Sequence, residues 1–521
     1  MKRDTATTRR GFLQAAGTAA AFASAPHTAG RDTGEPSAHL NVLLVLVDDL
    51  RPELGCYGSP HVKTPNIDRV AERGMTFLRS YCQQSASNPG RTALLTGLRP
   101  DTTRVYDHRV HFRATSPGAT TIPAHFRAHG YETTGFGRVF DSRDLDDEDS
   151  WSIPPWTPGS PAWGSPDNEG LARERWNGAR RAGWRVPAAR AGSVGSGVAA
   201  EPARDRSWWT AEEGDTLPDA QCAAEAAEAI GSMGGSRFLI AVGLQAPRLP
   251  LVAPAESIRL YPTGMSDAPQ APDPPRDAPP FALHGSEEIR GFADIPDSGP
   301  IPTSKGRELI RAYRACVSFA DRQIGVLLDA LESNGLSGST VVAIAGVTGS
   351  HLGELGLWGG HSTYEVATHT PLIVRAPGQS NAGRKTSALV ESVDLFPSLC
   401  ALCGLPGRRG MEGSSWRGVF DAPKRLWKRA VFSQQPRAIP GIGPGMGYSM
   451  RTARYRYTEW SALDSPYSTA ELYDYKEFRN EVRNFANRPE HLSLANGLAH
   501  MMREGWQGSL PPTQAPSRSR G

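Results

Sequence analysis

The sequence is poor in three features that mark particular classes of protein. Its 57 basic and 54 acidic side chains leave a formal net charge of only +3, without the basic excess typical of nucleic-acid-binding proteins. Six cysteines in 521 residues are too few for a disulfide scaffold. After residue 30, no run reaches the roughly 18 apolar residues that a membrane span needs. We therefore expect no nucleic-acid partner, no disulfide framework and no transmembrane segment.

Residues 1–30 have the pattern of an export signal. The segment 8–13 (TRRGFL) places two adjacent arginines before Phe-Leu, and a mild apolar run with small residues follows. This order is typical of a twin-arginine signal, an address for proteins that are exported already folded. The alternative is a chance Arg-Arg pair in an unstructured N-terminus. The pattern predicts export by the twin-arginine machinery to the periplasm or the extracellular space.

A continuous apolar run at residues 41–47 (NVLLVLV) is typical of a strand that is buried on both faces of a parallel sheet. It ends in Asp48 and Asp49, and the active sites of open α/β sheets gather at such strand ends. The alternation of strands and helices predicts an α/β core, residues 38–410, with a mostly parallel sheet and helices on both faces. Comparable patterns predict further strands at 238–242, 341–345 and 372–374, and helices at 65–71 and 309–331.

Two stretches interrupt this alternation, and the last third of the chain changes character. Residues 151–217 and 262–302 are rich in proline and lack periodicity, which predicts long surface loops or insertions. The last third predicts a small α+β subdomain, residues 430–505, and a disordered tail at 506–521. Its predicted strands are 430–433, 448–460 and 471–475, and a helix follows at 489–502.

Short blocks along the chain follow one another in the order found in one enzyme family. They are 47–52 (VDDLRP), 55–58 (GCYG), 64–68 (TPNID), 99–104 (RPDTTR), 352–354 (LGE), 367–369 (ATH), 393–399 (VDLFPSL) and 471–474 (ELYD). Together they resemble the sulfatases, and most closely the iduronate-2-sulfatase branch of that family. The resemblance implies an alkaline-phosphatase-like α/β core with a small C-terminal subdomain, and the hydrolysis of sulfate esters.

The resemblance also implies a reaction centre. In sulfatases a Cys or Ser is oxidised to formylglycine, whose hydrated form attacks sulfur while a calcium ion polarises the sulfate. The family signature occurs here as SNPGR, so Ser87 takes the nucleophile position and Arg91 braces it. Gly90 stands where the family usually has serine, and an unmodified loop serine is the alternative for Ser87. Asp48 and Asp49 match the first pair of calcium carboxylates.

Other positions of the reaction centre depart from the family pattern. Valine cannot bind calcium through its side chain, and threonine offers only a neutral hydroxyl. Arginine keeps the charge of lysine but not its shape, and an aspartate in place of a histidine would repel sulfate. Arg138 and Arg248 remain candidates for contacting a substrate. Val347 and Thr348 stand where the family has an Asp-His or Asp-Asn pair, and Gly360 stands where it has a lysine. Ala246 and Arg248 replace the first and last residues of the family's Lys-Pro-His motif. Arg138 replaces a lysine, and Asp141 replaces a histidine.

We therefore hypothesise an exported relative of iduronate-2-sulfatase that has lost much or all of its hydrolytic activity. It would bind a sulfated glycan, such as a glycosaminoglycan, or a small sulfate ester. The first alternative is a working sulfuric ester hydrolase on sulfated polysaccharide, with formylglycine at Ser87 and calcium held by Asp48, Asp49 and further ligands. The second alternative is a phosphate or phosphonate ester hydrolase with Ser87 as the direct nucleophile.

Two further groups of residues allow other binding roles. His351, Glu354 and His361 follow the missing acidic pair closely in sequence, and a His/Glu cluster can bind a softer metal. Ordinary loop residues are the alternative. The stretch 173–190 interleaves arginine with tryptophan, which can grip a sulfated sugar through bidentate contacts and stacking. An arginine-rich surface loop gives the same pattern without a ligand.

Overall fold

The computed structural model describes residues 40–141, 145–158, 206–264, 268–478 and 480–512. The predicted export signal, the stretch 173–190 and the end of the predicted tail lie outside these residues. No helix in the described part of the chain combines the length and the apolar character that crossing a bilayer requires.

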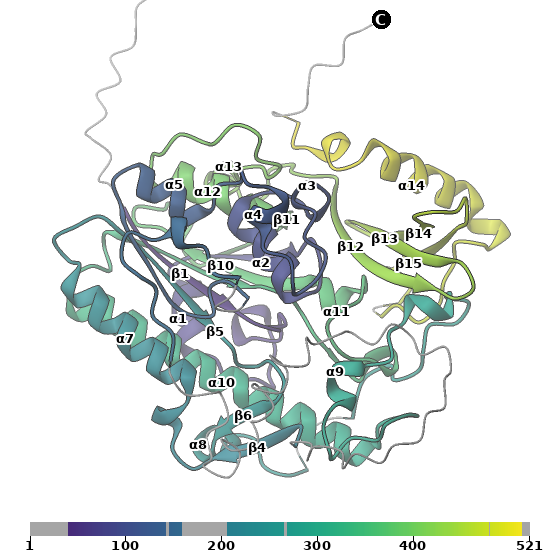
Figure 1. The fold of residues 1–521 in the computed structure, drawn as a ribbon, viewed down its shortest axis with the longest axis horizontal. Helices are drawn as coiled ribbons and strands as arrows, with labels where there is room; N and C mark the ends of the chain where they lie inside the picture. Colours follow the sequence, from purple (N-terminus) through teal and green to yellow (C-terminus); the bar gives the residue numbers. More distant parts are fainter. Residues whose placement is uncertain (1–39, 142–144, 159–205, 265–267, 479, 513–521) are drawn as a thin grey trace, which may run out of the picture. The chain divides into compact units, whose positions relative to one another are not determined.

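A seven-stranded sheet with the strand order β11-β2-β10-β7-β1-β5-β3 forms the core (Figure 1). β3, β5, β1 and β7 run parallel, β10 is antiparallel to both neighbours, and β11 is parallel to β2. The predicted α/β core with a mostly parallel sheet is confirmed, and each strand predicted within it is present. The bounds are β1 (Asn41–Val47), β2 (Met75–Tyr81), β3 (Glu132–Gly137), β5 (Phe238–Leu244), β7 (Thr340–Gly346), β10 (His369–Arg375) and β11 (Arg384–Glu391).

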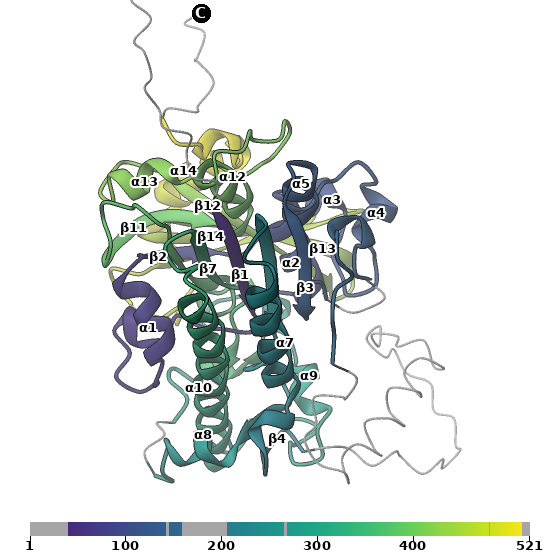
Figure 2. The ribbon, with the colours of Figure 1, turned by 90° about the vertical axis from the view of Figure 1, so that its left-hand side faces the viewer.

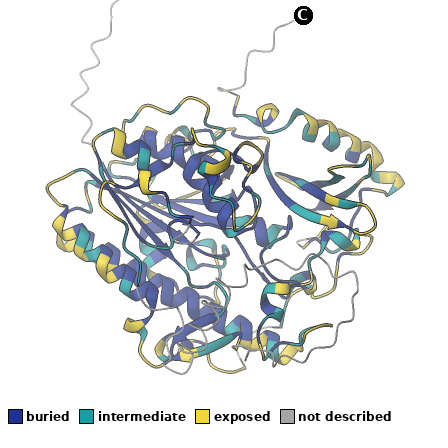
Figure 3. Ribbon diagram, in the orientation of Figure 1, coloured by how far each residue is buried: buried dark blue, intermediate teal, exposed yellow. Residues whose placement is uncertain are grey.

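Helices cover both faces of this sheet, as predicted. On β1, Leu43 and Val45 pack into the core on one face, and Leu44 and Leu46 pack into the core on the other, because side chains alternate along a strand. This explains the continuous apolar run, because β1 is buried along its whole length (Figure 3). One face of the sheet carries α1 (Pro65–Glu72), α7 (Pro218–Ser232) and α10 (Thr303–Ser333), and α7 and α10 lie side by side (Figure 2). The other face carries α2 (Ser87–Thr96), α5 (Ile122–Ala128), α12 (Leu395–Leu402) and α13 (Arg417–Asp421).

A four-stranded antiparallel sheet follows in the C-terminal third, with α14 (Leu492–Glu504) packed against it. The prediction of one strand over 448–460 is wrong, because the chain turns at Ala453 and Arg454. The apolar and aromatic pattern continues on both sides of this tight turn, so periodicity alone does not reveal it. The strands are β12 (Ala430–Ile439), β13 (Gly443–Thr452), β14 (Tyr455–Ala462) and β15 (Ser468–Asp474).

Short elements occupy the connections. The predicted loop regions contain β4 (Trp208–Ala211), which pairs in parallel with β6 (Leu251–Pro254), and the short helix α9 (Glu287–Arg290). β8 (His351–Leu352) and β9 (Trp358–Gly359) form a small hairpin. All six cysteines are buried and unpaired, which makes them part of the core. The remaining short helices are α3 (Pro100–Thr103), α4 (Phe112–Thr115), α8 (Ala255–Arg259) and α11 (Glu365–Thr368).

Candidate active site

Four strand ends meet at one edge of the central sheet. Because β7, β1, β5 and β3 are parallel neighbours, their carboxyl ends lie side by side. α2 follows β2 and brings Ser87 and Arg91 to the same edge, where Arg91 contacts the chain after β1 and β3. The side chains beyond the strands are those singled out in the sequence: Thr348 after β7, Asp48 and Asp49 after β1, Arg248 after β5, and Arg138 and Asp141 after β3.

Asp48 is buried, and both of its carboxylate oxygens accept hydrogen bonds from arginine. Nη2 of Arg91 lies 2.5 Å from Oδ1, and Nη1 of Arg138 lies 3.1 Å from Oδ2. The side chains of Asp48 and Arg91 are each only 1% exposed. A buried carboxylate needs a compensating positive charge. Two guanidinium groups supply it here.

Asp141 holds Arg138 from the other side. Its carboxylate accepts a hydrogen bond from Arg138 and lies 3.2 Å from Nδ1 of His108. Burial opposes the ionisation of Asp141, but the charges and hydrogen bonds of Arg138 and His108 outweigh it and hold the pKa of Asp141 well below its ordinary value. Arg138 therefore bridges Asp48 and Asp141, and its guanidinium is engaged on both sides.

The protonation state of Asp49 depends on pH near neutrality. Its backbone is left-handed, with φ 50°, and its carbonyl oxygen accepts a hydrogen bond of 2.7 Å from the hydroxyl of Tyr313. Its Oδ1 accepts a hydrogen bond of 2.8 Å from Thr348. Burial, followed by the negative charges of Glu288 and Asp48, raises the pKa of Asp49 to about 7. Asp49 therefore changes its charge near neutral pH.

Arg248 and Glu288 form the partly exposed border of the site. Nη2 of Arg248 lies 3.5 Å from Oε1 of Glu288, and the two side chains are 33% and 30% exposed. Ion pairs that contact water are weak, so Glu288 does not use up the donors of Arg248. Arg138, by comparison, is only 12% exposed. Of the two predicted substrate contacts, Arg248 is the one that an incoming ligand can reach.

Ser87 is the first residue of α2, and its Oγ accepts a hydrogen bond of 3.3 Å from Nε of Arg91. One turn later, Gly90 faces the strand end that carries Val347 and Thr348. A Cβ atom at Gly90 would lie 3.5 Å from both Cγ2 of Thr348 and the carbonyl oxygen of Val347. Gly90 and the Val347–Thr348 pair both depart from the sulfatase pattern and are distant in sequence, yet they lie against each other in the fold.

Ala246 and Gly360 present no charge to the site. The backbone N–H of Ala246 donates to Oδ2 of Asp219 over 2.8 Å, so this buried carboxylate anchors the loop after β5. At Gly360 a Cβ atom would lie 3.1 Å from Oγ of Ser85, which leaves little room for any side chain. Two expected cations are thus replaced by small residues: Ala246 packs against apolar side chains, and Gly360 lies against Ser85.

His351, Glu354 and His361 do not form a cluster. Nε2 of His351 lies 2.8 Å from Oγ of Ser362, and Glu354 is ion-paired with Arg51 at 2.8 Å. Burial, followed by the charge of Arg51, lowers the pKa of His351 to about 3. Across the residues that the structure describes, no group of three or more His, Cys, Asp or Glu side chains is placed to hold a metal ion. The geometry gives no support to a softer-metal site at these three residues.

The donor set at the strand edge does not fit a calcium ion. Calcium takes about six to eight oxygen ligands, mostly from carboxylates. The edge offers Asp48, whose two oxygens are engaged by arginine, Asp49, whose pKa lies near neutrality, and the hydroxyl of Thr348. A cation placed between these donors would also meet the guanidinium of Arg138 as a like charge.

Sequence reasoning missed several polar residues that complete the site. His108, Asp219, Glu288 and Tyr313 come from loops or helices distant in sequence, and each contacts the strand edge only in the folded chain. Asp219 alone had a local signal, because it follows a proline at the start of a helical pattern. The others have no spacing that connects them with the predicted residues.

Comparison with known proteins identifies the family. The family model described as "Sulfatase" matches residues 40–405, and the family model described as "N-sulphoglucosamine sulphohydrolase, C-terminal" matches residues 353–507. The protein belongs to the sulfatase family, within the alkaline-phosphatase-like superfamily. The family generally uses calcium and formylglycine, and the donor set of this chain departs from that pattern.

Within the family, the chain is related to iduronate 2-sulfatase. It is 33% identical to the iduronate 2-sulfatase of Mus musculus, over 89% of this chain and 93% of that protein. It is 34% identical to the iduronate 2-sulfatase of Homo sapiens, over 81% of this chain and 85% of that protein. The family and branch predicted from the sequence blocks are confirmed.

Solved structures share the fold. A phosphonate monoester hydrolase from Silicibacter pomeroyi has a TM-score of 0.69 at 21% identity, over 91% of this chain and 96% of that chain. A protein in complex with its substrate D-glucosamine-2-N,6-O-disulfate has a TM-score of 0.68 at 18% identity, over 90% of this chain and 98% of that chain. At these identities the likeness establishes the fold and leaves the reaction open.

Proposed function

We propose that this chain is a sulfatase-fold protein that binds a sulfated glycan without the calcium-dependent hydrolysis of its family. The observation that carries the proposal is the enclosure of Asp48 between Arg91 and Arg138. In the family pattern Asp48 is a calcium ligand. Here arginine provides the positive charge that a buried carboxylate requires.

The energetics favour the arginine arrangement over a bound ion. Calcium binding to Asp48 would displace a buried guanidinium from its partner, and a buried charge left without its partner costs about 3–5 kcal/mol. The remainder of the cage cannot offset this cost, because Val347 is fully buried and apolar and Thr348 already donates to Asp49. These contacts support the loss of the catalytic ion.

The partly exposed groups support binding of an anionic ligand. Arg248 and His108 are each 33% exposed, and a guanidinium can hold a sulfate through two parallel hydrogen bonds. Relatives named iduronate 2-sulfatase, and a structural neighbour bound to a disulfated glucosamine, make a sulfated glycan the favoured class. Each of three carboxylates at the site is paired with a guanidinium: Asp48 with Arg91 and Arg138, Asp141 with Arg138, and Glu288 with Arg248.

One observation favours a working sulfatase as the second candidate. Ser87 lies at the start of α2 with its Oγ 3.3 Å from Nε of Arg91, as expected for the family nucleophile. Oxidation to formylglycine is detectable by peptide mass spectrometry after co-expression with a serine-type maturation enzyme. The third candidate, a phosphate or phosphonate ester hydrolase, rests on fold likeness alone.

The test pairs binding with turnover. We expect heparin-derived sulfated disaccharides to bind the purified chain saturably, and Arg248→Ala to weaken this binding by about tenfold or more. Sulfate release should be undetectable with or without calcium and maturation enzyme. Calcium-dependent sulfate release would establish the working sulfatase, and phosphodiesterase activity that is lost in Ser87→Ala would establish the third candidate. Failure of every tested sulfated saccharide to bind the chain would contradict the proposal.

We further propose that residues 1–30 direct export by the twin-arginine route, and that residues 38–410 and 430–505 are two domains. The arginine pair and the small residues that follow support the first proposal, and the two separate sheets support the second. Fusing residues 1–30 to a reporter that is active only after export tests the signal. An Arg9→Lys, Arg10→Lys double variant of that fusion should stay inside the cell.

A further inference from the structure

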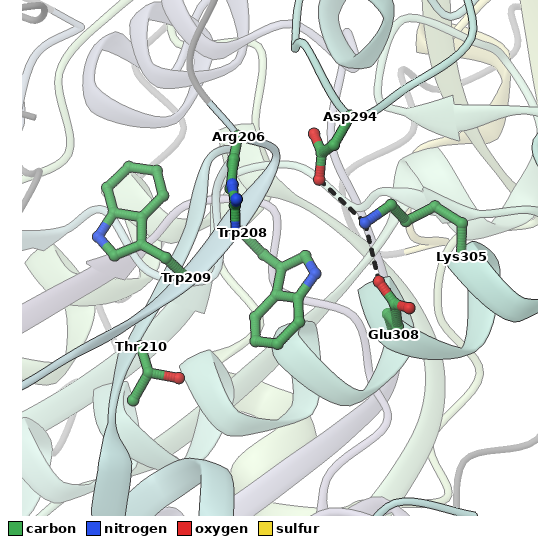
Figure 4. Close-up of a pocket in the computed structure, with 7 residues that line it drawn as sticks. All are labelled: Arg206, Trp208, Trp209, Thr210, Asp294, Lys305 and Glu308. Carbon is green, nitrogen blue, oxygen red and sulfur yellow. Dashed lines mark hydrogen bonds and ion pairs between the residues drawn. The ribbon is translucent and has the colours of Figure 1, made fainter.

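A cavity of about 470 Å³ lies where β4 meets the N-terminal end of α10. Its volume falls in the range of roughly 300–1,000 Å³ that small ligands occupy. None of its lining residues takes part in the site at the strand edge. They are Arg206, Trp208, Trp209, Thr210, Asp294, Lys305 and Glu308 (Figure 4).

The polar walls of this cavity are held in place by their neighbours. The backbone N–H and the hydroxyl of Ser207 donate to Asp294 over 2.7 and 2.8 Å. Nζ of Lys305 lies 2.9 Å from Oδ2 of Asp294 and 2.8 Å from Oε2 of Glu308. These contacts join the start of β4, the loop after α9 and the first turns of α10. A ligand would therefore meet groups that are already positioned, which lowers the entropic cost of binding.

The chemistry of the lining selects against strongly charged and against apolar ligands. Two cations, Arg206 and Lys305, are balanced by two carboxylates, Asp294 and Glu308. A phosphate or a sulfate would approach both carboxylates, and a hydrocarbon would cover charged groups without hydrogen-bonding them.

A sugar ring can contact both the charged and the aromatic groups of the lining. Its hydroxyls can donate to carboxylates and accept from ammonium and guanidinium groups, and its C–H face can pack on an indole ring. Figure 4 shows the indole of Trp208 on the side of β4 that faces Lys305 and Glu308. The aromatic surface and the hydrogen-bonding groups thus border one space.

We infer that this cavity binds an uncharged saccharide unit. The inference deepens the proposed function and rests on it in one respect, namely that the unit belongs to the same glycan whose sulfate meets Arg248. α10 connects the two places, because Lys305 precedes Tyr313 by roughly 12 Å of helix rise and Tyr313 donates to the backbone of Asp49. The cavity would then add affinity for the unsulfated part of the ligand.

The test uses the full chain and a panel of neutral di- and tetrasaccharides built from glucose, galactose and their N-acetylamino forms. Saturation-transfer NMR and calorimetry should reveal at least one binder. Lys305→Met and Thr210→Arg should weaken it by about tenfold or more. Thr210→Arg fills the cavity while it keeps both indoles, so it separates loss of binding from loss of packing. Arg307→Gln, an exposed change on the same helix, should leave binding unchanged.

The outcomes separate this inference from the proposed function. Neutral saccharide binding that persists in Arg248→Ala and is lost in both cavity variants supports the inference, even where sulfated disaccharides fail to bind. Sulfated disaccharide binding that depends on Arg248, with no neutral saccharide bound, overturns the inference and leaves the proposed function standing. Neutral binding that survives both cavity variants also overturns it.

Discussion

Nη1 of Arg138 donates to Oδ2 of Asp48 over 3.1 Å, which joins the chain beyond β3 to the chain beyond β1. In the family pattern the first position is a lysine near the substrate and the second is a calcium ligand. Together with Arg91, Arg138 compensates the negative charges of Asp48 and Asp141. The site no longer needs a metal ion to compensate Asp48.

Removal of the Arg138 guanidinium should destabilise the fold. Arg138→Leu leaves Asp141 and one oxygen of Asp48 without their charged partner in a buried setting. Loss of one member of a buried ion pair costs about 3–5 kcal/mol, and we expect a decrease of that size in the free energy of unfolding. Unfolding in guanidinium chloride measures this free energy, with Arg307→Gln as the exposed control variant. A decrease below about 1 kcal/mol, as for a surface pair, contradicts this reading.

Asp49 should make the protein less stable as the pH rises towards neutrality. Its pKa is 3.8 in an unperturbed side chain and about 7 in the folded chain, so the folded state holds the extra proton between these values. Stability therefore falls as the pH rises through that interval. Asp49→Asn keeps an acceptor for Thr348 and removes the titration.

We expect Asp49→Asn to raise the free energy of unfolding by roughly 2–4 kcal/mol above pH 8 and to change it little near pH 4. Denaturation curves across this range measure the difference between the variant and the unmodified chain. Equal differences at both ends would show that Asp49 ionises normally in the folded state.

Sulfated ligands should bind more tightly when Asp49 is protonated. Ionised Asp49 adds one negative charge beside the ligand, whereas protonated Asp49 adds none. We expect the dissociation constant of a sulfated disaccharide to rise by about tenfold as the pH passes upward through 7. Burial also raises the pKa of Asp219, to about 6, and Asp49→Asn separates the contribution of Asp219. A full pH dependence retained in that variant would assign the effect to a group other than Asp49.

Calcium binding should be recoverable by design. Val347→Asp and Thr348→Asn restore the oxygen donors after β7, and Arg138→Lys removes one of the two guanidiniums that hold Asp48. We expect the triple variant to bind calcium with a dissociation constant in the micromolar to millimolar range. The double variant that retains Arg138 should bind at least about tenfold more weakly, because both oxygens of Asp48 then stay paired with arginine. Equal affinity in the two variants would remove Arg138 from the explanation.

The sequence predicted the parts of this site that follow from strand ends, and the family resemblance supplied the rest of the candidate positions. The apolar run before Asp48 predicted that this residue lies at a sheet edge. Arg138, Arg248 and Thr348 were candidates through the resemblance, and the structure places them beside Asp48 at the ends of parallel strands. The strand β3 was not predicted, because its glycines weaken the apolar pattern. The sheet order, which no local pattern encodes, decides which of these side chains meet.

Pairing between side chains could not be predicted for the same reason. Asp48 and Arg138 become neighbours only because β5 lies between β1 and β3, with Arg91 reaching both loops from α2. His108 and Glu288 enter from connections that have no periodicity. The substituted positions were visible in the sequence, whereas their mutual compensation required the three-dimensional arrangement.

The most direct test of the account is a calorimetric calcium titration of the purified chain without residues 1–30. This measurement does not depend on the chemical state of Ser87, and the triple variant that combines Val347→Asp, Thr348→Asn and Arg138→Lys serves as the positive control. We predict no binding heat up to millimolar calcium in the unmodified chain. Stoichiometric calcium binding that disappears in Asp48→Ala would contradict the account and would favour the alternative that the chain is an active sulfatase.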